Sequence, residues 1–217
     1  MSTPILDEYA LALDGLSAAL ESSFTKMKES SLSRENLDYS NILLARLRAF
    51  YCAQDNIKKF LGKRVAQAGA DFFVEGVLFS LKLFNEIENL NFQIISERAI
   101  QHKRKAIRPD ISIWRGDRLL AVVECKTQLG WMRSNWKSHF AKRERDLKEA
   151  CPEAKLFVLV MTSCNWSGFD DQLDSSEVNQ QFFCLLKDIW PTQIPEVFNL
   201  SLLESPIENL LQQVEKL

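Results

Sequence analysis

The stretch from Arg108 to Trp131 constrains this chain most, because it has the pattern of two short strands joined by a tight turn. Ile111 to Trp114 alternates apolar and polar residues, and Leu119 to Cys125 is a mostly apolar run. Both patterns are typical of strands. Between them, Arg115-Gly116-Asp117 supplies turn residues. The stretch therefore predicts a β-hairpin.

Two acidic residues and a lysine come together if these strands pair. Pro109 lacks a backbone N–H, which suits the first residue of a strand, and Asp110 follows it directly. Side chains along a strand alternate between faces, so Glu124 and Lys126 point the same way and Cys125 points the other way. Asp110 then arrives beside Glu124 near the open end of the hairpin. The sequence predicts two carboxylates and one ammonium on one patch of a sheet.

Such a patch has a defined chemistry. Two carboxylates held close together repel each other, and a divalent cation removes the repulsion. Mg²⁺ prefers oxygen ligands, keeps several waters, and is held by one or two carboxylates plus phosphate oxygens of a substrate. A neighbouring lysine can position a water, or help to lower its pKa, for in-line attack on phosphorus.

Length and composition indicate one globular domain. The 217 residues are enough for a substantial core, so we treat 1–217 as a single domain. Within it we expect an N-terminal helical elaboration over 1–62, a core over 67–161 and a C-terminal helical extension over 162–217. No segment approaches the roughly 20 apolar residues of a membrane span, and the N-terminus lacks the pattern of a signal peptide.

The cysteine and histidine content narrows the class of site. Five cysteines without a CxxC pair argue against a disulfide framework or a zinc site, and they fit a reducing, cytoplasmic environment. Two histidines are too few to favour a histidine-built metal centre.

The positive charge is concentrated around the hairpin, although the whole chain carries a net charge of −2. Residues 98–148 contain fourteen Lys and Arg against five Asp and Glu, and the rest of the chain is strongly acidic. A basic surface of this kind attracts phosphates. The alternative is that these charges form solvated helix faces.

The periodicity of the remaining segments predicts the order of the other elements. Apolar residues at helical spacing predict a helical hairpin from helices over about 3–24 and 35–60. A buried helix over 67–90, a strand over 91–97 and a helix over 135–150 follow. Leu156 to Met161 is a continuous apolar run, typical of a strand buried on both faces and parallel to its neighbours. We expect a helix over 178–189, and Ser205-Pro206-Ile207-Glu208 predicts a capping box that begins the last helix. That last helix docks either on the core or on a second subunit.

Pro109-Asp110 followed by Glu124-Cys125-Lys126 resembles the PD-(D/E)xK motif of restriction endonucleases and related DNA-processing enzymes. The order of helix, three strands, helix and strand over 67–161 resembles the core of that superfamily, and a motif in its correct setting is stronger than the motif alone. The resemblance implies an α/β protein with a restriction-endonuclease-like αβββαβ core, a mixed central sheet, and helical additions at both ends.

The same resemblance implies an activity. We expect a Mg²⁺-dependent endonuclease that hydrolyses DNA phosphodiester bonds. A type II restriction endonuclease fits best, because the compact chain has no ATPase motif such as GxxxxGK[ST]. Such enzymes usually act as homodimers on palindromic sites. The alternatives are a DNA repair or junction-resolving nuclease of the same fold, and a nucleic-acid- or protein-binding module that keeps the fold without cleaving.

The resemblance assigns roles to individual residues. Asp110 and Glu124 are the expected metal ligands, the Cys125 carbonyl is a further possible ligand, and Lys126 orients or activates the attacking water. An acidic residue from the helix before the first strand often completes such a site. Glu75 is the candidate because it lies in the most apolar part of that helix, and Glu86 is the fallback. Glu75 could instead reach solvent or an arginine.

DNA contacts are expected from the basic segment around the motif. Gln128 keeps the parity of Glu124 and Lys126 if the strand continues, and it could bond a metal water or a phosphate oxygen. The stretch before the hairpin could clamp a phosphate backbone, or it could be a flexible surface loop. The expected nucleic-acid-binding residues are Lys103, Arg104, Lys105, Arg108, Gln128 and Lys137.

Overall fold

The computed structural model describes residues 7–30, 37–102, 104, 106–128, 135–164, 180–195 and 205–217. Helices and strands follow one another as the sequence predicts over most of this length. In chain order they are α1 (Glu8–Asp14), α2 (Leu16–Ser30), α3 (Tyr39–Leu61), α4 (Ala70–Ile87), β1 (Gln93–Ser96), β2 (Ile111–Arg115), β3 (Arg118–Lys126), α5 (Trp136–Ala150), β4 (Lys155–Thr162), β5 (Phe182–Leu186), the short 3₁₀ helix η4 (Pro191–Gln193) and α6 (Pro206–Glu215).

The strands form one mixed, open sheet in the order β1-β2-β3-β4-β5. β1, β2 and β3 pair antiparallel, whereas β3, β4 and β5 pair parallel. The protein is therefore an α/β protein, and the predicted order of helix, three strands, helix and strand is confirmed by α4-β1-β2-β3-α5-β4. The predicted turn is confirmed as well. Arg115 of β2 pairs with Arg118 of β3, and Gly116 between them adopts the left-handed conformation (φ 60°).

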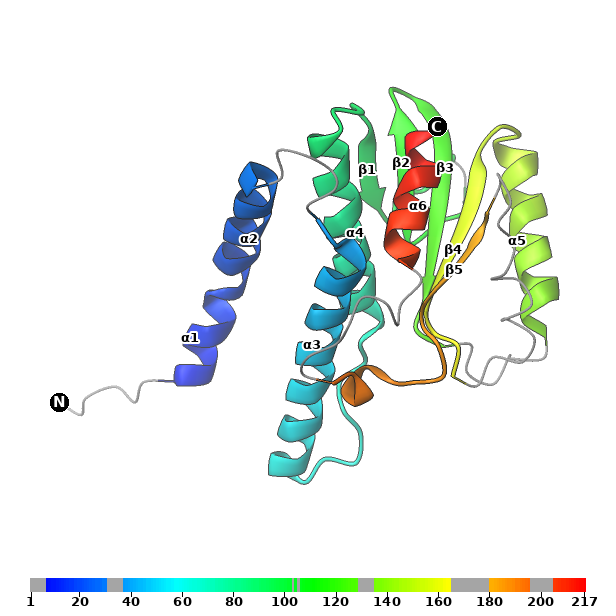
Figure 1. Cartoon of the computed structure of the whole chain (residues 1–217). Coiled ribbons are helices and arrows are strands. Elements are labelled where there is room, and N and C mark those ends of the chain that lie inside the picture. The colour runs from blue at the N-terminus through cyan, green and yellow to red at the C-terminus, as the bar shows by residue number, and fades with distance from the viewer. Residues whose placement is uncertain are drawn as a thin grey trace.

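Helices cover the sheet on both faces (Figure 1). α3, α4 and α6 lie on one side, where their apolar side chains join those of the sheet in the largest core cluster. α5 lies on the other side, where Trp136 and Leu147 pack against β3, β4 and β5. The last helix thus docks on the core of its own chain, which decides the alternative that the sequence left open. None of the described helices is long and apolar enough to cross a membrane.

The N-terminal helices differ from the predicted hairpin. The chain breaks into α1 and α2 at Gly15, and α1 begins after Asp7, whose carboxylate caps the backbone N–H groups of Tyr9 and Ala10. α2 packs on α4 rather than pairing with α3 as a hairpin, through Phe24 against the ring of Phe79. The expected helix start at Thr3-Pro4 lies outside the described residues.

The expected helix over 178–189 is wrong. Phe182–Leu186 is the strand β5, which pairs parallel with β4, and its last four residues are buried. A short continuous apolar run has no period that distinguishes a buried strand from a buried helix. This segment forms a strand because the edge of β4 supplies partners for its backbone hydrogen bonds. The C-terminal extension is therefore not wholly helical.

The predicted capping box of α6 is also replaced by a tertiary contact. The Ser205 side chain makes no capping hydrogen bond. Instead, the Ser40 hydroxyl accepts a hydrogen bond from the Ile207 N–H at 3.1 Å. Glu208 accepts hydrogen bonds from the Ser40 hydroxyl and from the Ser40 N–H, the latter at 2.9 Å. These bonds fix α6 to the start of α3.

Candidate active site at the end of the central hairpin

The pairing of β2 with β3 brings Asp110 to Glu124. Ile111 pairs with Val123 in the antiparallel ladder, so the residues before and after them lie opposite each other at the open end of the hairpin. The backbone of Asp110 is held on its other side, because its carbonyl accepts a hydrogen bond from the Glu97 N–H at 3.2 Å. The register expected from the sequence is therefore confirmed.

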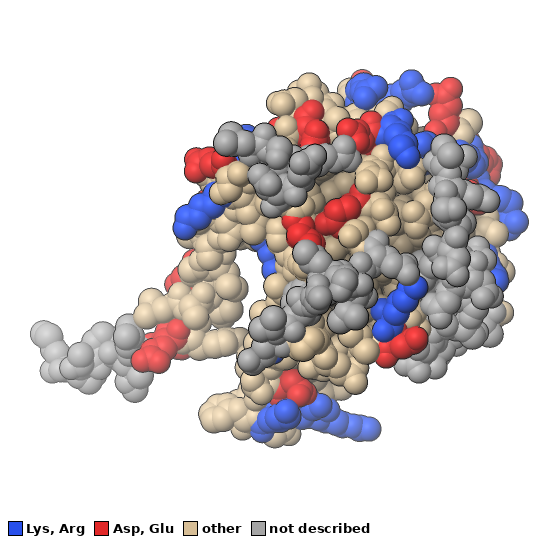
Figure 2. All heavy atoms as spheres, in the orientation of Figure 1, with Lys and Arg blue, Asp and Glu red and all other residues tan. Residues whose placement is uncertain are grey.

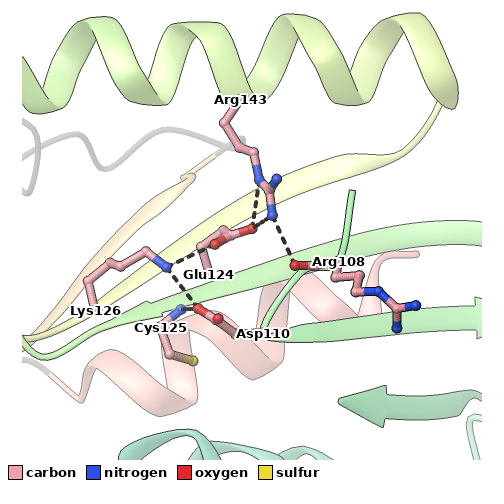
Figure 3. A network of polar contacts seen from close by, with 6 residues as sticks. All are labelled: Arg108, Asp110, Glu124, Cys125, Lys126 and Arg143. Carbon is pink, nitrogen blue, oxygen red and sulfur yellow. Dashed lines mark hydrogen bonds and ion pairs between the residues drawn. The ribbon is translucent and has the colours of Figure 1, made fainter. Parts of the chain in front are cut away.

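Side chains along β3 alternate between the two faces of the sheet, so the charged residues of this patch and Cys125 lie on opposite faces. Glu124 and Lys126 lie on the face of the sheet towards α5, and Cys125 points the other way (Figure 3). Cys125 belongs to the core cluster that includes α4 and α6. Burial raises the pKa of its thiol well above the ordinary value, with a further contribution from the Asp110 carboxylate. The thiol is thus neutral and unreactive at neutral pH.

Lys126 joins the two carboxylates. Its ammonium donates hydrogen bonds to Asp110 Oδ2 and to Glu124 Oε2, both at 2.9 Å (Figure 3). The two carboxylate oxygens can therefore lie no farther apart than twice that distance. Asp110 Oδ2 also accepts the backbone N–H of Cys125 at 2.7 Å. Asp110, directly before β2, thus meets Glu124 and Lys126 of β3 at one point, as predicted.

Arg143 of α5 is a fourth member of the site, and it is not among the site residues expected from the sequence. Its Nε and Nη2 donate to Glu124 Oε1 at 2.9 and 2.6 Å, and Nη2 also donates to the Arg108 carbonyl at 3.2 Å. A signal was present in the sequence. Arg143 lies seven residues after Trp136 and four before Leu147, the two buried residues of α5, so it shares their face of the helix.

Burial makes the charge pairing necessary. The Glu124 side chain is only 9% exposed, whereas those of Asp110, Arg143 and Lys126 are 30%, 31% and 41% exposed. A buried carboxylate is costly unless it is paired and hydrogen-bonded. Glu124 meets this condition with two cations, and the formal charges of the four side chains cancel. The cluster is closed on the Glu124 side and open to solvent at Asp110 and Lys126.

The charge state of Lys126 follows from the same contacts. Desolvation lowers its pKa, but the attraction of Glu124 and Asp110, together with their hydrogen bonds, outweighs desolvation and leaves the pKa above its ordinary value. The ammonium is therefore protonated at neutral pH. In this arrangement Lys126 acts as a hydrogen-bond donor and a positive charge, and it is not a proton acceptor.

The two acidic residues expected from the preceding helix do not reach this cluster. Glu75 is exposed on α4, where it interacts electrostatically with Arg46 of α3, and Glu86 forms an ion pair with Lys28 of α2 at 2.5 Å. α4 packs on the face of the sheet opposite to Glu124. Glu75 therefore follows the alternative that the sequence left open, since its side chain is exposed to solvent.

The expected DNA-contacting residues lie in different settings. Arg108 is exposed beside the cluster, and its guanidinium donates to the Glu97 carbonyl at 3.2 Å. Arg104 and Gln128 are exposed, and Lys137 lies over the ring of Trp136. Lys103 and Lys105 lie outside the described residues. Of this set, Arg108 is joined to the cluster by a hydrogen bond, through its carbonyl.

The donor set is suited to a hard cation that needs few protein ligands. Asp110 and Glu124 supply carboxylate oxygens on one patch, which is the set that Mg²⁺ uses together with waters and phosphate oxygens. Across the described residues, no group of three or more His, Cys, Asp and Glu is placed to hold a metal ion. A zinc-type site built wholly from side chains is thus not found in that part of the chain. Oxygen ligands beyond this pair would come from the backbone, water or substrate.

Searches of protein-family models, curated proteins and solved structures returned no match to this chain. The interpretation of the cluster therefore depends on its own geometry and chemistry.

Proposed function

We propose that the protein is a Mg²⁺-dependent endonuclease that hydrolyses DNA phosphodiester bonds, on a restriction-endonuclease-like fold. The observation that carries the proposal is the convergence of the Asp110 and Glu124 carboxylates on the Lys126 ammonium, at 2.9 Å from each. The order α4-β1-β2-β3-α5-β4 supports it, because Asp110 directly precedes β2 and Glu124 and Lys126 lie on β3, as the resemblance to PD-(D/E)xK nucleases leads us to expect.

Asp110 and Glu124 are the residues that would hold Mg²⁺, and the Cys125 carbonyl stays a predicted further ligand. When bound, Mg²⁺ supplies Lewis-acid activation of water and neutralises charge on phosphoryl oxygens. The exposure of Asp110 leaves its carboxylate accessible from solvent. Glu124, held by Arg143 with two hydrogen bonds to one oxygen, provides a fixed second carboxylate.

Lys126 has the position and charge needed at the reacting phosphate. Its ammonium can donate to the attacking water or to a phosphoryl oxygen, and its positive charge opposes the negative charge that builds up in the transition state. Asp110 and Glu124 raise its pKa in this arrangement, so it is a cation before metal and substrate bind. Its hydrogen bonds to two carboxylates orient it before substrate arrives.

Within this class we favour a type II restriction endonuclease, with a DNA repair or junction-resolving nuclease as the alternative. A non-cleaving binding module is a second candidate function, and one observation favours it. The two carboxylates and the two cations Lys126 and Arg143 already balance in charge, so the cluster also works as a purely structural ion-pair network.

Incubation with supercoiled plasmid and linear phage DNA tests the proposal. Mg²⁺ and a chelator are compared in parallel, and binding of the same DNA is followed by a mobility shift. Discrete Mg²⁺-dependent fragments indicate a restriction endonuclease, and nicking or preference for branched DNA indicates a repair enzyme. Binding with no cleavage on any of these substrates contradicts the nuclease proposal and favours the binding module.

A further inference from the structure

The exposed large apolar side chains of the described chain fall into two segments. One is α1 with the start of α2, and the other is the C-terminal end of α3 with the residues that follow it. Exposed apolar residues scattered singly are normal, but a cluster marks a site of interaction. The side chains are Tyr9, Leu11, Leu13 and Leu16 in the first segment, and Phe60, Leu61 and Val65 in the second.

The first segment stands away from the body of the protein. α1 has seven residues, none of them buried, and among the described elements it contacts mainly α2. α2 is itself fixed to α4 by Phe24 and by the ion pair of Lys28 with Glu86. Figure 1 shows α1 projecting beyond that attachment as an arm. A helix this short is marginal in water without tertiary contacts, so its apolar residues need a surface to cover them.

The second segment also extends beyond the core. The buried residues of α3, Tyr39 to Leu47, all lie in the first half of the helix. Gly62, in the left-handed conformation (φ 62°), ends the helix, and the Lys63 N–H bonds back to the Lys58 carbonyl. Phe60 is 89% exposed at this end and Val65 is 71% exposed. The segments of one chain therefore do not cover each other.

The two segments carry opposite charge. Residues 7–16 contain Asp7, Glu8 and Asp14 and have no Lys or Arg, which gives −3. Residues 54–65 contain four cations and Asp55, which gives +3, the cations being Lys58, Lys59, Lys63 and Arg64. In Figure 2 the arm carries acidic side chains, basic side chains gather at the tip of α3, and open space separates arm from body. We call residues 7–16 the α1 patch and residues 54–65 the α3 patch.

We propose that the α1 patch of one copy docks on the α3 patch of a second copy, and that the exchange is reciprocal in a two-fold symmetric dimer. Each copy offers one acidic apolar surface and one basic apolar surface, so a two-fold axis satisfies all four at once. Two equivalent contacts also double the apolar area that one short helix can bury. The patches lie outside the Asp110–Glu124–Lys126 cluster, so the inference is independent of the proposed function.

Oppositely charged substitutions in the two patches test the exchange. Leu13→Lys, on the helix face that Tyr9 and Leu16 share, places a cation against the basic α3 patch, and Phe60→Glu places an anion against the acidic α1 patch. Both sites are exposed in the isolated chain, so folding is checked by circular dichroism and is expected to be unchanged. Ser138→Lys and Ser138→Glu, at an exposed position of α5, are the matched controls. Association is measured by sedimentation equilibrium of the full chain over a range of protein and salt concentrations.

The expected results have a distinctive pattern. The unmodified protein forms a dimer that weakens as salt increases. In each patch variant the dissociation constant of the dimer rises about tenfold or more, which corresponds to roughly 1.4 kcal/mol. The controls leave it unchanged. A mixture of the two patch variants recovers dimers. One contact of the mixed dimer is unmodified, and the other brings the introduced lysine of the first variant against the introduced glutamate of the second.

Four outcomes overturn the inference. The first is a monomer at every concentration, as expected if the arm folds back on its own chain. The second is a dimer that Leu13→Lys disrupts and Phe60→Glu does not, which indicates pairing of α1 with α1. The third is a dimer that neither substitution weakens, and the fourth is a pair of variants that fail to recover association when mixed.

Discussion

The two faces of strand β3 differ in what holds their side chains in place. Towards α5, Glu124 is buried among charged partners and depends on Lys126 and Arg143. Towards α4 and α6, Cys125 is buried in an apolar cluster in which the dominant contribution is the area removed from water. Neighbouring residues of one strand thus face a charged cluster on one side and an apolar core on the other, and a register shift by one residue would exchange them.

The difference between the two faces of β3 predicts which substitutions affect activity and which affect stability. Changes at the open, charged side of the cluster should alter turnover and leave the fold intact. Changes in the apolar layer should lower the free energy of unfolding and leave the chemistry of folded molecules intact. Changes at Glu124 and Arg143 should affect both turnover and the free energy of unfolding, because the pairing of these two side chains contributes to each.

The largest expected effect is on turnover. Lys126→Ala should lower the rate of Mg²⁺-dependent DNA cleavage by about 10²–10⁴-fold, since it removes the cation at the reacting phosphate. DNA affinity and the circular dichroism spectrum should be retained. Lys82→Ala, at an exposed position of α4, is the matched control. Cleavage at the original rate by the Lys126 variant would remove this residue from the mechanism.

Truncation on the apolar face should act on stability. Phe73 is fully buried, and Phe73→Ala should lower the free energy of unfolding by about 3–5 kcal/mol, measured by urea denaturation. Cleavage per folded molecule should be unchanged. Phe60→Ala removes the same side chain from a position that is exposed in the single chain, and it should cost far less when unfolding is measured at protein concentrations that hold the monomer. Equal losses from the two variants would contradict the assigned core.

Removal of Arg143 should affect both properties. Arg143→Ala leaves the buried Glu124 carboxylate with Lys126 as its remaining cation, and we expect a loss of about 2–3 kcal/mol in the free energy of unfolding. Cleavage should fall as well, because Glu124 loses the two bonds that orient it. Arg145→Ala, on the exposed side of the same helix, is the control. If both variants behave alike, Arg143 does not position Glu124.

The junction of α3 with α6 should show a smaller effect. Ser40→Ala removes the hydroxyl that caps Ile207 and bonds Glu208, and it should cost about 1–2 kcal/mol. Thermal unfolding is the measurement. Ser138→Ala, at an exposed site whose hydroxyl bonds within the first turn of α5, should cost less. Identical melting temperatures for the two variants would show that the junction contributes little.

The smallest effect is expected at Glu75. Because its side chain is exposed on α4, Glu75→Gln should change the free energy of unfolding by no more than about 0.5 kcal/mol. It should also leave the Mg²⁺ dependence of cleavage unaltered. A shift of that dependence to higher Mg²⁺ concentration would instead restore the metal-site role that the resemblance implied.

Local patterns predicted the centre of the fold well. The alternation and the Gly116 turn predicted the hairpin, and the parity of Glu124, Cys125 and Lys126 predicted which side chains share a face. These features depend on neighbours within a few residues along the chain. The buried run of β4 likewise predicted a strand with parallel partners.

The errors concern contacts between distant elements. Glu75 lies in an apolar stretch, but its exposure depends on how α3 packs on α4. The bonds of Ser40 to Glu208 join residues 168 positions apart, and no local pattern encodes them. Arg143 was missed for a different reason. Its spacing from Trp136 and Leu147 places it on the inward face of α5, but a charged residue of a helix is expected to face solvent unless it has a buried partner, which here is Glu124.

The most direct test of the account compares two aspartates seven residues apart under one assay. Asp110 bonds Lys126 and Cys125 in the cluster, whereas Asp117 lies exposed in the turn of the same hairpin. Mg²⁺-dependent cleavage of plasmid DNA is measured for Asp110→Asn, Asp117→Asn and the unmodified protein. We expect cleavage to be lost in the first variant and retained in the second. Full cleavage by Asp110→Asn would contradict this expectation.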